Sequence, residues 1–424
     1  MEVLQDTYNE TNIGMLSVPS DWEVTKLGDN ASLKNGANFS TKDVGNGRLM
    51  VNVKDLYNFR PFVKIVNETR VGKIADSYIL NDGDILFVRS SLVREGVGFS
   101  AMYRNNGEET VYSGFIIRAR IESDKIFNPF IAYYLRSGLG RKKIVSLAGT
   151  VTITNIGQEG LSMLPIPIPP LPEQQKIAAI LSTVDEQIST TDKIIEKSKE
   201  LKKGLMQKLF SEGIGHTEFK DTKIGRIPKD WNTLKINQVA DCYGGTTPST
   251  VVEEYWNGDI LWATPSDITK NKSEYLLNTS RKITEQGRAS KNLRFVKKNG
   301  LLMTSRASIG FLNISNGDVV TNQGFINIEC KDNFHYKFFY YWVLDNRKKL
   351  LSLSQGSTFL ELYRKTFSKI SIPTPPLPEQ QKIATILSEA DAKIEKEQTQ
   401  KTQLETLKKG LMQQLLTGKK RVKV

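Results

Sequence analysis

Apolar side chains recur along two stretches of the chain at the spacing of a long amphipathic helix. The first stretch follows a run of prolines, and Pro172 suits the first helical position because a proline there loses no hydrogen bond. Its apolar residues follow in steps of four and three, with one register shift: Ile177, Leu181, Val184, Ile188, Ile194 or Ile195, Leu201, Leu205 and Leu209. Such steps are typical of a coiled-coil seam, so we expect a helix with one apolar stripe.

The second stretch repeats the first. PPLPEQQKIAAILS at residues 169–182 returns as PPLPEQQKIATILS at residues 375–388, and LKKGLMQ at residues 201–207 returns at residues 407–413. The second stripe has a polar break at Glu397 and Lys401 and otherwise comprises Ile383, Leu387, Ala390, Ile394, Leu404, Leu407, Leu411 and Leu415. The repeat indicates one structural unit present twice. Two equally long stripes favour burial against each other; the alternative is that each stripe packs on its own domain.

The segments before the two helices have a different pattern. Residues 18–165 predict a mixed, mostly-β domain, because short apolar runs alternate with turn sequences such as Asn35-Gly36 and Asn106-Gly107. A helical segment follows Pro129, and its Tyr133-Tyr134 pair aligns with Tyr340-Tyr341 of the second half. We interpret these aromatic residues as core. The predicted fold class is α+β, with two mixed, mostly-β domains joined by two long antiparallel coiled-coil helices in a pseudo-twofold internal repeat.

The repeat divides the chain into six parts. They are a lead-in at residues 1–17, a first domain at 18–168, a first helical spacer at 169–215, a second domain at 216–374, a second helical spacer at 375–417 and a basic tail at 418–424. The helices agree closely between the halves, whereas the domains diverge heavily. This difference suggests shared docking on the helices and separate recognition by the domains.

The charge balance points to an anionic partner. The 424 residues carry a formal net charge of +13 at pH 7, which is typical of proteins that bind nucleic acid. The two cysteines lack CxxC spacing and the two histidines lie far apart, so no metal site is expected. The polar, acidic start is unlike a signal peptide, and the longest apolar run, residues 338–344, is too short to span a bilayer. We expect a soluble, cytoplasmic protein without a membrane partner.

Catalytic motifs are missing from the sequence. There is no GxxxxGK[ST] phosphate loop, no cluster of carboxylates with a lysine after a strand, and no credible Ser/His/Asp arrangement. Asn128-Pro129-Phe130 lacks the second proline of an adenine methyltransferase motif, and no glycine-rich cofactor loop precedes it. We therefore expect a chain that is not an enzyme and has no catalytic residues, no metal and no cofactor of its own.

Side chains suited to base edges and phosphates lie in the diverged domains, with glycines nearby. Arginine can pair with guanine and asparagine or glutamine with adenine, whereas lysine, serine and threonine more often hold phosphates. Arg89 and Arg306 occupy matching positions, each six residues after an aligned glycine. The candidate DNA-binding residues are Lys34, Asn35, Asn38, Asn52, Lys54, Arg89, Ser90, Arg94, Thr150, Thr152, Thr246, Thr247, Ser249, Lys270, Arg306, Asn322, Gln323, Ser357 and Thr358. The candidates for subunit docking or helix pairing are Ile177, Leu181, Leu205, Met206, Ile383, Leu387, Leu411 and Met412.

The chain resembles the specificity subunits of type I restriction–modification systems. The resemblance lies in the two PPLPEQQKIA motifs, the two LKKGLMQ helix ends, the IPKDW segment at residues 227–231 and the TPS…YWNGDILW stretch at residues 247–262; the first half has VPSDW instead of IPKDW. It implies two target recognition domains that read an asymmetric, bipartite site in double-stranded DNA. It also implies that two methyltransferase subunits, which bind S-adenosylmethionine, dock on the helices, and that endonuclease/translocase subunits join for restriction.

Two other functions are compatible with the residues themselves. The chain could be an assembly scaffold whose repeated domains bind protein, or a stand-alone DNA-binding regulator that recruits no enzyme. Co-purification of a methyltransferase would separate the restriction–modification interpretation from both.

Overall fold

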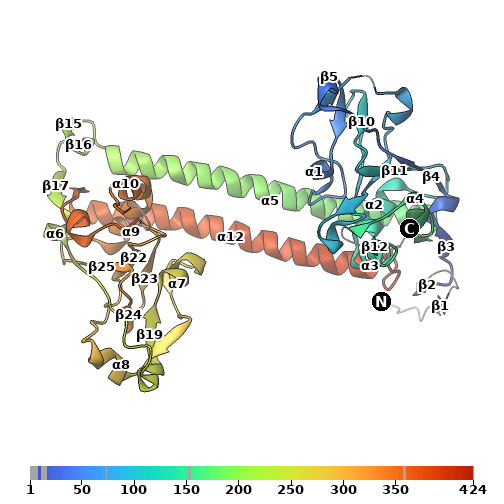
Figure 1. Ribbon diagram of the computed structural model, residues 1–424. Helices are drawn as coiled ribbons and strands as arrows, with labels where there is room; N and C mark the ends of the chain where they lie inside the picture. The colour runs from blue at the N-terminus through green and yellow to red at the C-terminus, as the bar shows by residue number, and fades with distance from the viewer. Residues whose placement is uncertain (1–7, 11–16, 73, 151–153, 357–359, 424) are drawn as a thin grey trace. The chain divides into compact units, whose positions relative to one another are not determined.

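The computed structural model describes residues 8–10, 17–72, 74–150, 154–356 and 360–423. The chain forms two compact units. The first unit comprises Met1–Lys193 with Thr399–Val424, and the second comprises Ile194–Gln398. Two long helices, α5 (Leu171–Glu212) and α12 (Leu377–Leu415), each contribute to both units (Figure 1). Because the units share the helices, the six boundaries assigned from the sequence stay a prediction.

The first unit is built on two sheets. A four-stranded sheet has the order β4-β11-β7-β9, and a three-stranded sheet has the order β10-β5-β6 with β10 parallel to β5. Their strands are β4 (Ala31–Asn35), β11 (Ile116–Ile121), β7 (Ile85–Val88), β9 (Ser100–Met102), β10 (Thr110–Tyr112), β5 (Val44–Val51) and β6 (Arg70–Val71). Helices α1 (Val53–Leu56), α2 (Asn128–Arg136), α3 (Gly138–Ser146) and α4 (Gln158–Ser162) accompany them. Short strands complete the unit: β1 (Tyr8–Glu10), β2 (Ser17–Pro19), β3 (Glu23–Lys26), β8 (Ser90–Ser91), β12 (Gly149–Thr150), β13 (Thr154–Asn155) and β14 (Pro165–Ile168).

The second unit repeats this topology. Its larger sheet has the order β18-β25-β22-β23-β20, and its smaller sheet has the order β21-β19-β24 with β24 parallel to β19. The strands are β18 (Ala240–Tyr243), β25 (Phe325–Cys330), β22 (Leu301–Thr304), β23 (Leu312–Ser315), β20 (Tyr275–Leu276), β21 (Arg281–Ile283), β19 (Trp256–Ala263) and β24 (Val319–Thr321). The remaining elements are β15 (Phe219–Thr222), β16 (Gly225–Pro228), β17 (Asn232–Lys235), β26 (Ser371–Thr374), α6 (Ile236–Val239), α7 (Pro265–Lys270), α8 (Glu285–Ser290), α9 (Tyr336–Asp345), α10 (Arg347–Ser352) and α11 (Arg364–Phe367).

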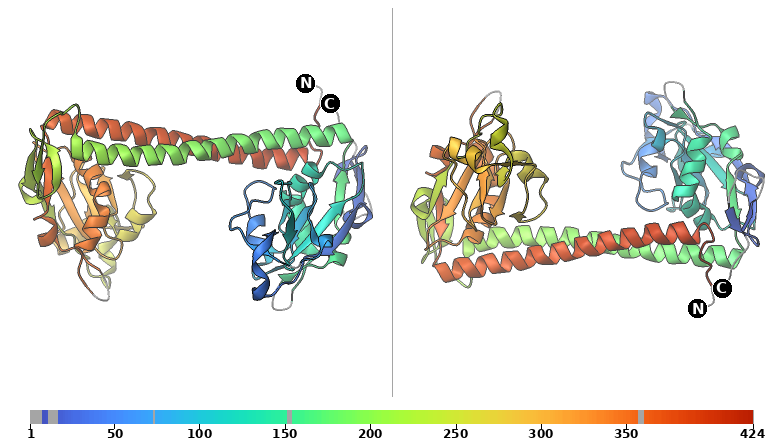
Figure 2. Two further views of the ribbon diagram at one scale, coloured as in Figure 1. Left: turned by 90° about the horizontal axis from the view of Figure 1, so that it is seen from above. Right: turned by 90° about the horizontal axis from the view of Figure 1, so that it is seen from below.

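The two helices pack side by side within each unit, as both views of Figure 2 show. In the first unit, ion pairs join Asp185 to Lys408 at 2.6 Å and Asp192 to Lys401 at 2.6 Å. From Asp185 to Asp192 the residue number rises along α5, whereas from Lys408 to Lys401 it falls along α12. The two helices are therefore antiparallel. The predicted α+β class, the duplicated mostly-β domains and the antiparallel pairing are confirmed.

The apolar stripes pack on the neighbouring helix and on the unit's own domain at once. Ile177 and Leu181 share one core with Leu415 of α12 and with Phe130 of α2. In the second unit, Met206 and Leu209 share a core with Ile383 and Leu387, and with Phe338 of α9. Leu205, Leu411 and Met412 are partly buried against the same two cores. Both alternatives for the burial of the stripes are therefore partly right.

Two residues of the predicted stripes, Leu201 and Leu407, are not buried. Leu201 and Leu407 are 71% and 50% exposed, because the lysine after each leucine turns toward the facing helix and pairs with Asp391 or Asp185. At the register shift Ile195 is buried and Ile194 is exposed. The helix also begins at Leu171, one residue before the expected Pro172.

The repeated PEQQ sequence fastens each domain to the start of its helix. The Glu173 carboxylate accepts a hydrogen bond from Trp22 Nε1 at 3.1 Å and from Arg421 Nε at 2.8 Å. Gln174 Oε1 accepts one from the Phe127 N–H at 2.8 Å. A buried carboxylate requires such partners, and its position at a helix N-terminus adds favourable electrostatics.

The second unit has the same arrangement with different partners. Glu379 accepts a hydrogen bond from Trp231 Nε1 at 3.0 Å and lies 2.9 Å from His216 Nε2. Gln380 Oε1 accepts one from the His335 N–H at 2.8 Å. His216 thus occupies the position that Arg421, from the end of the chain, takes in the first unit.

The tyrosines of the aromatic helices correct the sequence alignment by one residue. Tyr133 donates a hydrogen bond to Asp185 at 2.7 Å, and Tyr341 donates one to Asp391 at 2.9 Å. Tyr133 is therefore equivalent to Tyr341 and not to Tyr340. The core role predicted for these residues is confirmed, since Tyr133, Tyr134 and Tyr341 are buried.

The Asp185–Lys408 pair predicts a difference in stability between the two units. Asp185 is 1% exposed, so Lys408→Met leaves a buried carboxylate and should lower the free energy of unfolding of the first unit by about 3 kcal/mol. The matched control is Lys202→Met, whose partner Asp391 is 43% exposed, and we expect a loss below about 1 kcal/mol. Hydrogen exchange read separately on peptides of each unit measures both effects. Equal losses in the two variants would contradict this account.

Candidate nucleic-acid interface

In the first unit, several loops meet where strands of both sheets end. The loop at residues 113–115 joins β10 to β11, and its backbone is held on three sides. Ser113 N–H donates to Val51 O at 3.1 Å, Ile116 N–H donates to Ser113 O at 2.9 Å, and Arg89 N–H donates to Phe115 O at 2.9 Å. We call residues 113–115 the first reading loop. It is fixed by the backbone of the strands around it.

Two hollows flank the side chain of Phe115 in this loop. One, of about 360 Å³, is lined by Asn38, Arg89, Ser90 and Asn155 with Phe115. The other, of about 350 Å³, is lined by residues that include Asn52, Lys54 and again Phe115. The structure thus brings together five of the candidates predicted from the sequence: Asn38, Asn52, Lys54, Arg89 and Ser90.

Close backbone contact requires a glycine at one position of each unit. A Cβ atom on Gly36 would lie 2.0 Å from Ser113 O, and one on Gly245 would lie 1.9 Å from Thr321 O. Both glycines precede a residue whose N–H donates to the end of the parallel strand: Ala37 to Tyr112 O at 3.0 Å, and Thr246 to Thr321 O at 2.9 Å. In the first unit, these contacts hold the segment after β4 against the loop that follows β10. In the second unit, they hold the segment after β18 against the loop that follows β24.

The equivalent loop of the second unit lies at residues 322–324, and we call it the second reading loop. Its exposed residue is Gln323, whose Oε1 accepts a hydrogen bond from Thr247 Oγ1 at 2.6 Å. Asn322 Oδ1 accepts one from the Gly324 N–H at 2.9 Å, which stabilises the turn. The candidates Thr247 and Gln323 are therefore in direct contact.

Two tryptophans hold the segment that carries Thr246, Thr247 and Ser249. Trp262 Nε1 donates to Thr246 O at 3.3 Å, and Trp256 Nε1 donates to Ser249 O at 3.0 Å. The two indole rings meet edge to face with centroids 5.0 Å apart. The two tryptophans of the YWNGDILW sequence thus hold the backbone of this segment in place.

Arg89 and Arg306 do not occupy equivalent positions. Ser305 N–H donates to Gly324 O at 2.8 Å, as Arg89 N–H does to Phe115 O, so Ser305 is the counterpart of Arg89. Arg306 instead pairs with Glu361 at 2.9 Å. Counting from the two glycines misplaces the match by one residue, because Gly83 lies two residues before β7 whereas Gly300 lies one residue before β22.

Other candidates lie apart from these clusters. Lys34 Nζ donates to Ser77 O at 3.0 Å and lies 4.1 Å from the centre of the Tyr78 ring, and Asn35 is paired with Ile117 within the sheet. Arg94 and Lys270 are exposed at η4 (Arg94–Gly96) and at the end of α7. The backbone of Thr150 belongs to β12, and Thr152, Ser357 and Thr358 lie outside the described residues.

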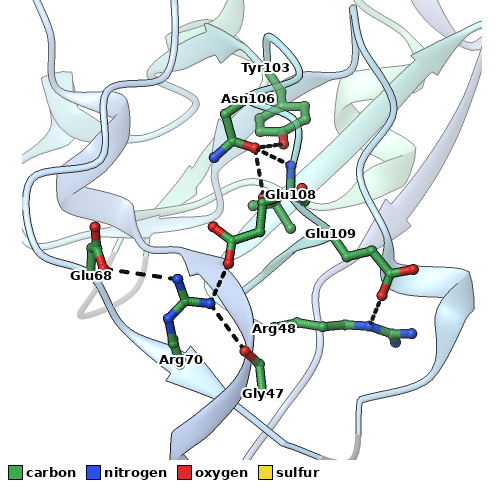
Figure 3. A network of polar contacts seen from close by, with 9 residues as sticks. Gly47, Arg48, Glu68, Arg70, Tyr103, Asn106, Glu108 and Glu109 are labelled. Atoms are coloured by element: carbon green, nitrogen blue, oxygen red, sulfur yellow. Dashed lines mark hydrogen bonds and ion pairs between the residues drawn. The ribbon is translucent and has the colours of Figure 1, made fainter.

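Not every basic side chain of the first unit is available to an anion. Arg48 on β5 pairs with Asp76 at 2.5 Å. Arg48 also pairs with Glu109 at 2.8 Å, and Arg70 on β6 pairs with Glu108 (Figure 3). The hydrogen bond from Arg70 lowers the pKa of Glu108, which favours its charged form. This network joins the start of β10 to β5 and β6, and it neutralises both arginines.

Phe115 is the residue that sequence reasoning missed. Exposed aromatic side chains are hard to predict, because most aromatic residues contribute to cores. The only signal in the sequence is the Ser113-Gly114 pair before it, which marks a turn between two apolar strands.

Among the residues that the structure describes, no three His, Cys, Asp or Glu side chains are grouped so that they could hold a metal ion. Within the same residues, no helix has the length and apolar character needed to cross a membrane.

The two domains with their variable loops and constant helix starts define a duplicated recognition fold. Residues 19–200 and 228–406 match the family described as the type I restriction modification DNA specificity domain, and the chain belongs to this family.

Similar proteins cover either one half or the whole chain. The type I restriction enzyme MjaIX specificity subunit of Methanocaldococcus jannaschii is 44% identical over 193 residues, which is 45% of each chain. The putative MjaX specificity subunit of the same organism is 30% identical over 99% of this chain and 98% of its own. The crystal structure of the type I restriction-modification S subunit from M. genitalium has a TM-score of 0.55 at 16% identity, covering 96% of this chain and 97% of that chain, and supports the fold.

The close approach at Gly36 predicts a strict requirement for glycine. Gly36→Ala should destabilise the first unit by roughly 1–3 kcal/mol, since the new Cβ can be accommodated only by moving the first reading loop. Gly138→Ala is the matched control, because a Cβ there meets nothing within 4 Å, and it should change stability by less than about 0.5 kcal/mol. Thermal unfolding of the variants measures the difference; an unchanged melting temperature for Gly36→Ala would show that the loop is not tightly held.

Proposed function

We propose that this chain is the DNA-recognition subunit of a type I restriction–modification complex and that each domain reads one half of an asymmetric, bipartite site. One observation carries this proposal. At equivalent positions beside the reading loops, the first domain has Asn38 and Gly114 where the second has Thr247 and Gln323, while the glutamate, glutamine and tryptophan at each helix start are the same. Side chains differ where sequence would be read and are constant where the domain is fastened.

The chemistry of the reading loops suits double-stranded DNA. Amides and a guanidinium match the donor and acceptor patterns of purine edges in the major groove, and lysine and serine suit phosphates. In the first domain, these groups surround one loop and are supplied by Asn38, Arg89, Lys54 and Ser90. The net charge of +13 favours such a polyanion.

The chemical step is assigned to partner subunits. Two methyltransferase subunits that bind S-adenosylmethionine would dock on the helices and modify an adenine in each half-site, and endonuclease/translocase subunits would join for restriction. Leu201 and Leu407, which open the two LKKGLMQ repeats, are exposed leucines on the helix surface. An exposed leucine at the same position of both repeats supports a docking site used twice.

The most direct test is methylation mapping. The chain is expressed with the methyltransferase that co-purifies with it, and methylated adenines are located by single-molecule sequencing. An asymmetric motif of two short sequences with a gap is expected. A complex that binds no DNA, or a continuous motif, would contradict the proposal.

DNA affinity should depend steeply on salt. If the complex contacts about six phosphates, the logarithm of the binding constant should fall with log salt at a slope near −5. Arg89→Ala should make this slope shallower by about one, or relax one base position, because Arg89 lines the first hollow. Lys125→Ala is the control: Lys125 pairs with Glu23 near the helix start, and its removal should leave the slope unchanged. A flat salt response would exclude phosphate contacts.

The exposed leucines should be needed for methyltransferase binding. Leu201→Glu and Leu407→Glu place a charge on the surface without disturbing either core, so the chain should stay folded and lose the co-purifying enzyme. Val251→Glu is the control, because Val251 is an even more exposed apolar residue in the second domain and lies off the helices. If the enzyme still co-purifies with the double variant, the docking surface lies elsewhere.

A further inference from the structure

Phe115 is an exposed aromatic residue whose backbone is held in place by hydrogen bonds. It is 67% exposed, although the carbonyl of the same residue accepts the Arg89 N–H at 2.9 Å. The loop before it is fastened to β5 through Ser113, and β11 begins directly after it. A loop held in this way presents the ring to solvent at a fixed position. A single exposed apolar side chain is common on protein surfaces, but this one is held in place and stands beside two hollows lined by candidate DNA-binding residues.

Polar side chains lie on both sides of Phe115. Asn38, Arg89 and Asn155 line the hollow on one side, and Asn52 and Lys54 line the hollow on the other together with the exposed Val66. The ring therefore stands between groups suited to hydrogen bonds with base edges and phosphates. A partner that meets this surface must offer polar groups beside an apolar group.

The second reading loop also exposes one side chain, but of a different type. There the exposed residue is Gln323, and the neighbouring position is Gly324, the counterpart of Phe115. In the first loop Gly114 takes the position of Gln323, and a Cβ on Gly114 would lie 2.1 Å from Asn38 Oδ1. Each loop thus projects one large side chain, an amide in the second domain and an aromatic ring in the first.

Base edges in the major groove carry one apolar group, the 5-methyl of thymine; every other readable group there is a hydrogen-bond donor or acceptor. We propose that Phe115 is a specificity-determining residue of the first half-site that contacts a thymine methyl, with Asn38 and Arg89 reading the adjacent base edges. This inference rests on the proposed DNA-recognition function. Gln323 reads the corresponding part of the second half-site by hydrogen bonds.

The test is a double-mutant cycle in which the Phe115 side chain and one thymine methyl group are removed separately and together. The full chain with its co-purifying methyltransferase binds duplexes in which each thymine of the first half-site is replaced in turn by uracil, which lacks only the methyl. For the wild-type chain one replacement should weaken binding roughly fivefold, the effect of one lost apolar methyl contact. In Phe115→Ala the same replacement should have no further effect. Phe115→Leu should keep most of the discrimination.

Controls separate this inference from the function on which it rests. Val44→Ala removes another exposed apolar side chain, at the far end of β5 from Val51, and should behave as wild type. Replacing thymines of the second half-site should affect wild type and Phe115→Ala equally. The methylated motif of the wild-type complex tests the proposed function independently of Phe115.

Three results from motif mapping and binding would overturn the inference. They are a first half-site without any A·T pair, equal losses on uracil replacement in wild type and Phe115→Ala, and unchanged affinity and motif in Phe115→Ala. A rise in 2-aminopurine fluorescence in the first half-site that requires Phe115 would also overturn it, since it would identify the ring as a wedge that unstacks bases.

Discussion

The whole arrangement depends on a glutamate at the start of each long helix, which is buried in the first unit and partly buried in the second. Glu173 and Glu379 each accept a hydrogen bond from a tryptophan indole and each have a basic side chain at hydrogen-bonding distance. A buried carboxylate destabilises the fold unless it has such partners. Removing one charged partner would lower the free energy of unfolding by about 3–5 kcal/mol. The hydrogen bond to Glu173 raises the pKa of Arg421, which keeps this guanidinium charged. These contacts therefore fix the domain to the start of its helix.

This constraint separates what must stay constant from what can vary. The helix start, the Asp–Tyr–Lys contacts and the glycine beside each reading loop have counterparts in both units: Asp185, Tyr133, Lys408 and Gly36 in the first, and Asp391, Tyr341, Lys202 and Gly245 in the second. The exposed side chains on the reading loops, Phe115 and Gln323, have no such constraint, since backbone hydrogen bonds and the Asn322 side chain hold the loops. A chain built in this way can change what it recognises without losing its fold.

The periodic parts of the fold could be predicted from the sequence, and parts that depend on a single partner could not. The repeat and the stripes predicted two long helices, because helix periodicity is a local property. The exposure of Leu201 and Leu407 was missed, because a lysine at a seam position makes sense only with Asp391 or Asp185 across from it. Several polar candidates do gather around one loop, but Lys34 has a local partner in Tyr78, and nothing in the local sequence distinguishes the exposed Phe115 from a core residue. Exposure of a single side chain is set by tertiary packing, which no local pattern contains.

The central claim is that each domain reads its half-site independently on a constant frame. It is tested most directly by replacing residues 244–371 with the equivalent segment of a relative whose target is known, while Trp231 and the α12 helix start with Glu379 are kept. Methylation mapping of the chimeric complex then gives the new motif. The account predicts that the half-site read by the second domain changes to that of the relative. The half-site read by the first domain should keep its base sequence. Changes in both halves would contradict it.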